Sequence, residues 1–161
     1  MRKLGNAGIV LSVLLVASVI LFAASPLSIA RMEKNSVPFK ASGKCNAVAV
    51  SPPPILEIYI SGSGQATHMG LVSIWQHHYV DVISMTFYGG VFVWTAANGD
   101  KLTGTYYGTM VPTSTGFEIH GFFTIDGGTG RFRTADGGGT ASGMQYFDNT
   151  ADLYLDGTIT Y

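Results

Sequence analysis

The residues best suited to chemistry in this chain are its histidines and acidic side chains, and they are scattered along the sequence. His77 and His78 are neighbours, but adjacent residues of a strand face opposite ways, so they cannot both line one site. His120 shares a polar face with Glu118, which predicts that it lies in solvent. A zinc site needs three or four converging ligands, and no such cluster stands out. We therefore expect no metal site and no cofactor.

Asp136 is the acidic residue with the strongest case for a role in binding or catalysis. In one continuous strand, Asp136 and Phe132 would point to the same face. If Phe132 points into the interior of the fold, the carboxylate lies inside or at its mouth and can orient a ligand or act as a general acid or base. The alternative is that the glycines after Asp136 bulge the strand and turn the carboxylate outward. Tyr106, whose hydroxyl a strand can place at the mouth, is the second candidate for ligand binding.

No signature of a nucleophilic enzyme accompanies these residues. The chain lacks the Gly-x-Ser-x-Gly pattern, and Cys45 has no evident base beside it. As the only cysteine, Cys45 cannot form an internal disulfide, and a small buried side chain is the simpler interpretation. The glycine run 137–139 lacks the Gly-Lys-Ser/Thr ending of a phosphate loop. Whether the protein is an enzyme stays open at this point.

An alternation of apolar and polar residues indicates the strands that position these side chains. In 117–126 the odd positions are apolar and the even ones mainly polar, which is typical of antiparallel sheet with one wet face. Asn98-Gly99 is a strong hairpin signal, and the run 51–54, Ser-Pro-Pro-Pro, predicts a stiff loop. We predict eight strands, at 38–48, 55–61, 68–80, 85–96, 101–111, 115–126, 130–146 (bent or bulged at 137–139) and 150–161.

Eight antiparallel strands in a segment of this length close naturally into a barrel, because closure leaves no exposed edge. The predicted fold class is all-β, a single antiparallel eight-stranded barrel without any helix longer than two turns after residue 31. Such barrels are filled by side chains or hold one small ligand. Most of the numerous aromatic residues are expected in the core, and a minority can line a cavity.

The segment 123–139 reads as a strand end, a tight glycine turn and the start of the next strand. Within it, Asp126-Gly127-Gly128-Thr129-Gly130-Arg131-Phe132-Arg133-Thr134-Ala135 resembles the glycine-rich motif of plant dirigent proteins and, more loosely, the corresponding turn of allene oxide cyclases. Both families form eight-stranded antiparallel barrels of one superfamily. The stretches 62–70 and 95–100 resemble exported bacterial proteins of unknown function that are thought to share this barrel.

The resemblance implies this barrel for roughly residues 37–161. It also implies that Gly127, Gly128 and Gly130 form the turn and that Phe132 points inward. Arg131 and Arg133, of opposite parity to Phe132, are then expected on the outer wall. Dirigent proteins steer the coupling of phenoxy radicals, and the cyclases close an unstable epoxide. Their pocket residues are not matched to positions here, so the resemblance implies the fold and not the activity.

The N-terminus has the pattern of an export signal. Arg2 and Lys3 precede an uncharged run from Leu4 to Ala30, which ends in small residues that suit a signal peptidase. Cleavage after Ala30 is one interpretation; the run is also long enough to stay as an uncleaved membrane anchor. Either way we expect segments 1–30 as signal or anchor, 31–37 as a tether and 38–161 as a barrel outside the cytoplasm, secreted, periplasmic or membrane-anchored.

The charge distribution restricts the classes of partner that the protein can bind. Residues 31–44 carry four basic residues against one acid, whereas residues 45–161 carry three against nine acids. An acidic body argues against a nucleic-acid partner, because binding a phosphate backbone needs a basic surface. Any membrane contact is expected only through the N-terminal segment, and oligomer formation stays open.

Two function classes follow from these observations, with a third behind them. The first is an exported barrel that binds a small hydrophobic or aromatic molecule without turning it over. The second is an enzyme of the cyclase or dirigent type that shapes a reactive intermediate inside the barrel. A structural or adhesive barrel without ligand is the third. An apolar cavity would favour binding, a buried carboxylate in a cavity would favour the enzyme, and a filled interior would favour the structural role.

Overall fold

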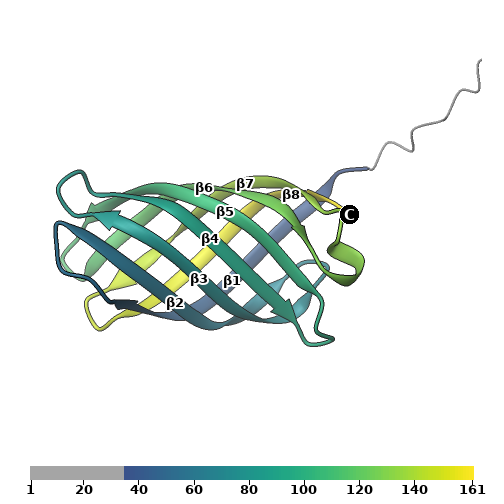
Figure 1. Cartoon of the computed structure of the whole chain (residues 1–161), viewed down its shortest axis with the longest axis horizontal. Coiled ribbons are helices and arrows are strands. Elements are labelled where there is room, and N and C mark those ends of the chain that lie inside the picture. Colours follow the sequence, from purple (N-terminus) through teal and green to yellow (C-terminus); the bar gives the residue numbers. More distant parts are fainter. Residues whose placement is uncertain (1–34) are drawn as a thin grey trace, which may run out of the picture. The chain divides into compact units, whose positions relative to one another are not determined.

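The computed structural model describes residues 35–161, which form a closed barrel of eight antiparallel strands (Figure 1). The predicted signal or anchor and most of the predicted tether lie outside the described residues. The strands are β1 (Val37–Ala49), β2 (Ile55–Ala66), β3 (Gly70–Asp81), β4 (Thr86–Ala96), β5 (Lys101–Pro112), β6 (Gly116–Gly128), β7 (Asp136–Tyr146) and β8 (Thr150–Thr160).

Each strand pairs with its neighbour in the sequence, and β1 pairs with β8 to close the sheet. The predicted fold class is thus confirmed, including the hairpin at Asn98-Gly99, where Gly99 has a φ of 87°. Alternation is visible in β3 and β6, where every second residue is buried or partly buried. Within residues 35–161, no helix is long and apolar enough to cross a membrane.

The connection between β6 and β7 differs from the expected continuous strand. Gly130–Phe132 form a short 3-10 helix, η1, and β7 begins only at Asp136. Gly130 has a φ of 56°, a left-handed conformation that glycine adopts without steric cost. The bulge expected at 137–139 is also wrong, since these residues pair in register with both β6 and β8. Register shifts instead occur in the pairs β3–β4, β4–β5 and β5–β6.

One end of the barrel interior is densely packed. It is the end that carries η1, the β4–β5 turn and the C-terminus (Figure 1). Phe132, contributed by η1, is fully buried there, as the glycine motif predicts. The other large side chains that are fully buried come from strand segments near this end: Phe39, Trp94, Leu102, Ile125 and Ile159. We call this region the closed end.

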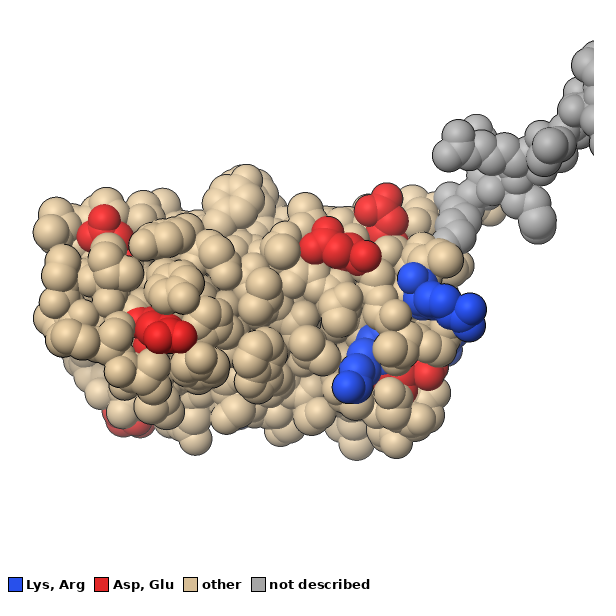
Figure 2. All heavy atoms as spheres, in the orientation of Figure 1, with Lys and Arg blue, Asp and Glu red and all other residues tan. Residues whose placement is uncertain are grey.

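The outer wall carries few charges. Figure 2 shows one face of the barrel that is largely uncharged, with its Lys and Arg side chains near the closed end. Arg131 and Arg133 are exposed, as predicted. Ion pairs between β1 and β8 join Lys40 to Asp156 at 3.1 Å and Lys44 to Asp152 at 3.3 Å.

Candidate functional site

The opposite end of the barrel interior, the open end, contains a cavity of about 310 Å³. It extends to the loops that join β3 to β4 and β7 to β8. Phe147, on the last of these loops, lines the cavity and is 65% exposed, so the cavity reaches the surface there. Most lining residues are apolar, among them Leu56, Ile58, Ile60, Val80, Val82, Met85, Phe87, Phe92, Met110, Phe117, Ile119, Phe123, Leu153 and Leu155.

The cavity exists because one wall of the barrel is built from small residues. Neighbouring strands β7, β8 and β1 contribute alanines to the lining, namely Ala141, Ala151, Ala47 and Ala49. At the closed end, β1 and β8 supply larger side chains, namely Phe39 and Ile159. The size of the inward side chains therefore changes along the barrel axis, and this change separates the packed end from the hollow one.

The main polar feature of the cavity wall is a hydrogen-bonded pair, His78 and Tyr106. Nδ1 of His78 lies 2.7 Å from the Tyr106 hydroxyl. The two residues belong to β3 and β5 and meet across β4, where the strand is irregular. Gly90 of β4 makes room for this contact, since a Cβ there would lie 2.8 Å from the Tyr106 ring. Tyr106 thus lines the cavity, although its role in binding remains a prediction; His78 was not predicted as a site residue.

Burial controls the charge of this pair. Burial, and to a lesser extent the neighbouring His77, lower the pKa of His78 to about 4. Burial also raises the pKa of Tyr106 far above its ordinary value. Both side chains are therefore neutral at physiological pH. Among the described residues, no Asp, Glu, Lys or Arg lines the cavity.

Gln76 is a second polar residue inside the barrel that we did not predict from the sequence. It lies two residues before His78 on the same face of β3, lines the cavity and is only 6% exposed. Among residues 35–161, no side chain or backbone group forms a hydrogen bond with its side-chain amide. The amide is also not sealed inside the protein, since the fully buried polar side-chain atom without a partner in this part of the chain is Nε1 of Trp94, and it is therefore available to a ligand in the cavity.

Asp136 does not face the barrel interior, which corrects our expectation. It is exposed and is not part of the cavity wall. The inference from Phe132 assumed a continuous strand, but η1 and the residues after it break the alternation between positions 132 and 136. Gly137 and the odd positions after it face inward, and Asp136 faces outward. The structure therefore gives Asp136 no place in the candidate site.

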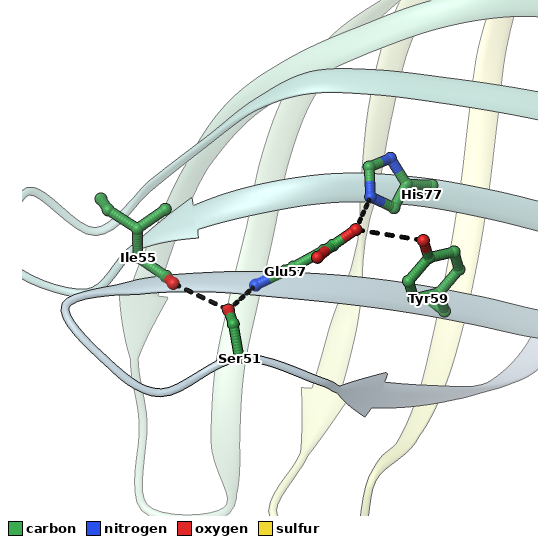
Figure 3. Close-up of polar contacts among 5 residues, drawn as sticks. All are labelled: Ser51, Ile55, Glu57, Tyr59 and His77. Carbon is green, nitrogen blue, oxygen red and sulfur yellow. Dashed lines mark hydrogen bonds and ion pairs between the residues drawn. The ribbon is translucent and has the colours of Figure 1, made fainter.

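His77, the sequence neighbour of His78, belongs to a polar cluster on the outer wall (Figure 3). Oε1 of Glu57 accepts hydrogen bonds from Nε2 of His77 and from the Tyr59 hydroxyl, both at 3.0 Å. The Glu57 backbone N–H donates to Oγ of Ser51 at 2.6 Å, and Ser51 donates to the Ile55 carbonyl. Because the serine contacts backbone groups and not the imidazole, this cluster has no activated nucleophile.

The described residues offer little else of chemical interest. No group of three His, Cys, Asp or Glu side chains within 35–161 is placed to hold a metal ion. Cys45 is buried, as expected; burial and, secondarily, Asp152 raise its pKa to about 11, so the thiol stays protonated. His120 is exposed beside Glu118, as predicted, with 3.3 Å between Nε2 and Oε1.

No family model matches this chain, and comparisons with curated proteins and with solved structures give no match. The resemblance to dirigent proteins and allene oxide cyclases therefore stays a prediction that rests on the quoted motif. The candidate site has to be interpreted from its own geometry.

Proposed function

We propose that this protein is an exported barrel that binds a small, mainly apolar molecule in the cavity at its open end. The observation that carries the proposal is the cavity itself. Its volume lies near the lower end of the range for small-molecule sites, roughly 300–1,000 Å³. Its apolar lining with a few polar groups is the usual composition of such sites.

The rim of the open end supports the same proposal. Exposed apolar side chains lie on the loops and strand ends around it: Val50, Ile55, Ile83, Val111 and Phe147. An apolar ligand can thus reach the cavity along an apolar surface. Exposed apolar residues that are grouped together mark binding surfaces, whereas single exposed apolar residues are normal on any domain.

The alternatives have less support. A barrel with a purely structural role has no need of a cavity, and a cyclase- or dirigent-type enzyme would be favoured by a buried carboxylate. The cavity wall carries no such group among the described residues, and the one acidic residue with a predicted role, Asp136, lies outside it. A non-catalytic binding protein is the function that this arrangement supports best.

The proposal is tested by native mass spectrometry of the full-length protein expressed with its own N-terminus. We expect a bound small molecule in the wild type and its loss in Ala141→Phe, because the phenyl ring would occupy the cavity. The intact mass of the exported form tests the compartment, with a chain that begins at Arg31 as the expected result. A protein that stays in the cytoplasm would contradict the export part of the proposal.

A further inference from the structure

We propose that the ligand is a neutral, mainly apolar carbonyl compound whose carbonyl group is bound by Gln76 together with the His78–Tyr106 pair. This inference rests on the proposed function and adds the chemical class of the ligand. It is drawn from three properties of the cavity wall: an amide without a partner, a spare hydrogen-bond donor, and the lack of charge.

The amide of Gln76 is the first argument. Its neighbours in the sheet are Ile60 on β2 and Phe92 on β4, so neither adjacent strand offers it a polar side chain. Gln76 as a residue is only 6% exposed and its amide borders the cavity, so a ligand in the cavity is the natural hydrogen-bond partner for this group. Its NH2 group can donate to a ligand oxygen that enters the cavity.

The His78–Tyr106 pair supplies the second donor. A neutral imidazole has one N–H and a phenol has one O–H, so the pair holds two protons that can be donated. The hydrogen bond between Nδ1 and the hydroxyl uses one of them, whichever way it runs. One donor is therefore left, on Nε2 of His78 or on the Tyr106 oxygen. Among the described residues, this donor has no further protein partner.

The two donors belong to one side of the cavity. Gln76 and His78 are alternate residues of β3 and therefore lie on the same face, about 7 Å apart along the strand. A carbonyl oxygen has two lone pairs and can accept two hydrogen bonds. Side chains of the length of Gln and His can converge on such an oxygen from these positions.

Because the cavity wall carries no charged side chain, it disfavours ligands that carry a carboxylate. No Lys or Arg lines the cavity among the described residues, and His78 is held neutral by its burial. A carboxylate that entered would lose its hydration without gaining a counter-ion, which is strongly unfavourable. A ketone, ester or amide avoids this cost and still uses both donors.

The test compares three probes of equal chain length: methyl nonyl ketone, undecane and undecanoate. Each is titrated against the full-length protein loaded with the neutral fluorescent probe N-phenylnaphthylamine, and displacement gives its affinity. We expect the ketone to bind roughly tenfold more tightly than undecane, the effect of about one net hydrogen bond. Undecanoate is expected to bind more weakly than the ketone.

Two variants locate the effect. Gln76→Leu and the double variant His78→Leu/Tyr106→Phe, which removes both protons of the pair, should each reduce the preference for the ketone over undecane toward equality while undecane binding persists. Gln65→Leu is the matched control, because Gln65 is exposed on the outer wall of β2, and it should keep the wild-type preference. Circular dichroism shows whether each variant is folded, and either inner variant suffices for the test.

The outcomes separate this inference from the proposed function. If all three probes bind equally well and Ala141→Phe abolishes binding, the cavity is a binding site but the carbonyl assignment is overturned. Tighter binding of undecanoate than of the ketone overturns it as well. If neither the fluorescent probe nor any of the three compounds binds the wild type, both the proposed function and this inference fail.

Discussion

The two ends of the barrel interior are built from the same eight strands but differ in what fills them. At the closed end, large side chains from five strands and η1 are fully buried, Phe132 among them. At the open end, alanines on β7, β8 and β1 face longer side chains on the other strands, and a cavity of about 310 Å³ remains. The polar groups Gln76, His78 and Tyr106 line this hollow part. The comparison teaches that one sheet can bury a set of large side chains at one end and leave a cavity with polar groups at the other.

The largest expected difference between the two ends comes from truncating a phenylalanine in each. Phe132→Ala should lower the free energy of unfolding by about 3–5 kcal/mol, because the site is fully buried and cannot collapse. Phe117→Ala should cost only about 1–2 kcal/mol, since Phe117 is partly exposed and already borders empty space. Urea denaturation measures both values. Equal losses would mean that the open end is packed as densely as the closed end.

Acidification should weaken the open end through His78. The pKa of His78 falls from its ordinary value of 6.5 in the unfolded chain to about 4 in the folded protein, mainly by burial. Below pH 6.5 the unfolded state therefore binds a proton that the folded state does not, and stability decreases as the pH falls toward 4. The expected loss is roughly 3 kcal/mol over this window.

The His78 contribution can be isolated by substitution. Thermal melts between pH 7 and pH 4 should show a shallower loss of stability in His78→Gln than in the wild type. His120→Gln, a change at an exposed histidine, serves as the control and should follow the wild type. If His78→Gln shows the same pH dependence as the wild type, His78 is not buried in the neutral form.

At the closed end, Gly130 shapes the connection that delivers Phe132 to the core. Gly130→Ala should destabilise the protein by about 2 kcal/mol, because φ is 56° and a Cβ would collide with the Asp100 carboxylate. Gly99→Ala provides a matched comparison: φ is 87°, but nothing lies near the added Cβ, so we expect about 1 kcal/mol. Chemical denaturation of the two variants checks the order. A reversed order would show that the contact with Asp100 does not constrain the turn.

The smallest effect is expected on the outer wall, where His77 contrasts with its buried neighbour. Glu57→Gln removes the charge that His77 and Tyr59 contact, yet it should change stability by less than about 1 kcal/mol, because partly exposed ion pairs contribute little. The change should diminish further at high salt. A loss comparable to that of Phe132→Ala would assign the outer cluster a structural role that we do not expect.

Much of the fold could be predicted from the sequence because an antiparallel barrel repeats a pattern of period two. The alternation in 117–126, the Asn98-Gly99 turn and the glycine motif around Phe132 all predicted features that the structure confirms. The misplacement of Asp136 has a simple physical cause. Two residues an even number of positions apart face the same side only if the backbone between them is continuously extended. Here the 3-10 helix η1 interrupts the extended backbone between Phe132 and Asp136.

The candidate site was harder to predict, although β3 contained a usable signal. Val72, Ile74 and Val80 share one parity, which marks the even face of this strand as the inner one. Gln76 and His78 lie on that face and so had to be inside. The cavity itself could not be predicted, because it depends on how inward side chains from all eight strands fill a shared volume. The contact between His78 and Tyr106 also depends on the irregular pairing of β4.

The central claim, that the open end binds an apolar molecule and the closed end does not, is tested most directly by titrating N-phenylnaphthylamine against three proteins. The wild type and Ala97→Phe, a control at the exposed β4–β5 turn of the closed end, should bind one probe per barrel with equal affinity. Ala141→Phe, whose added ring fills the cavity, should remain folded and lose binding. Saturable binding that is unchanged in Ala141→Phe, or the absence of binding in the wild type, would contradict the claim.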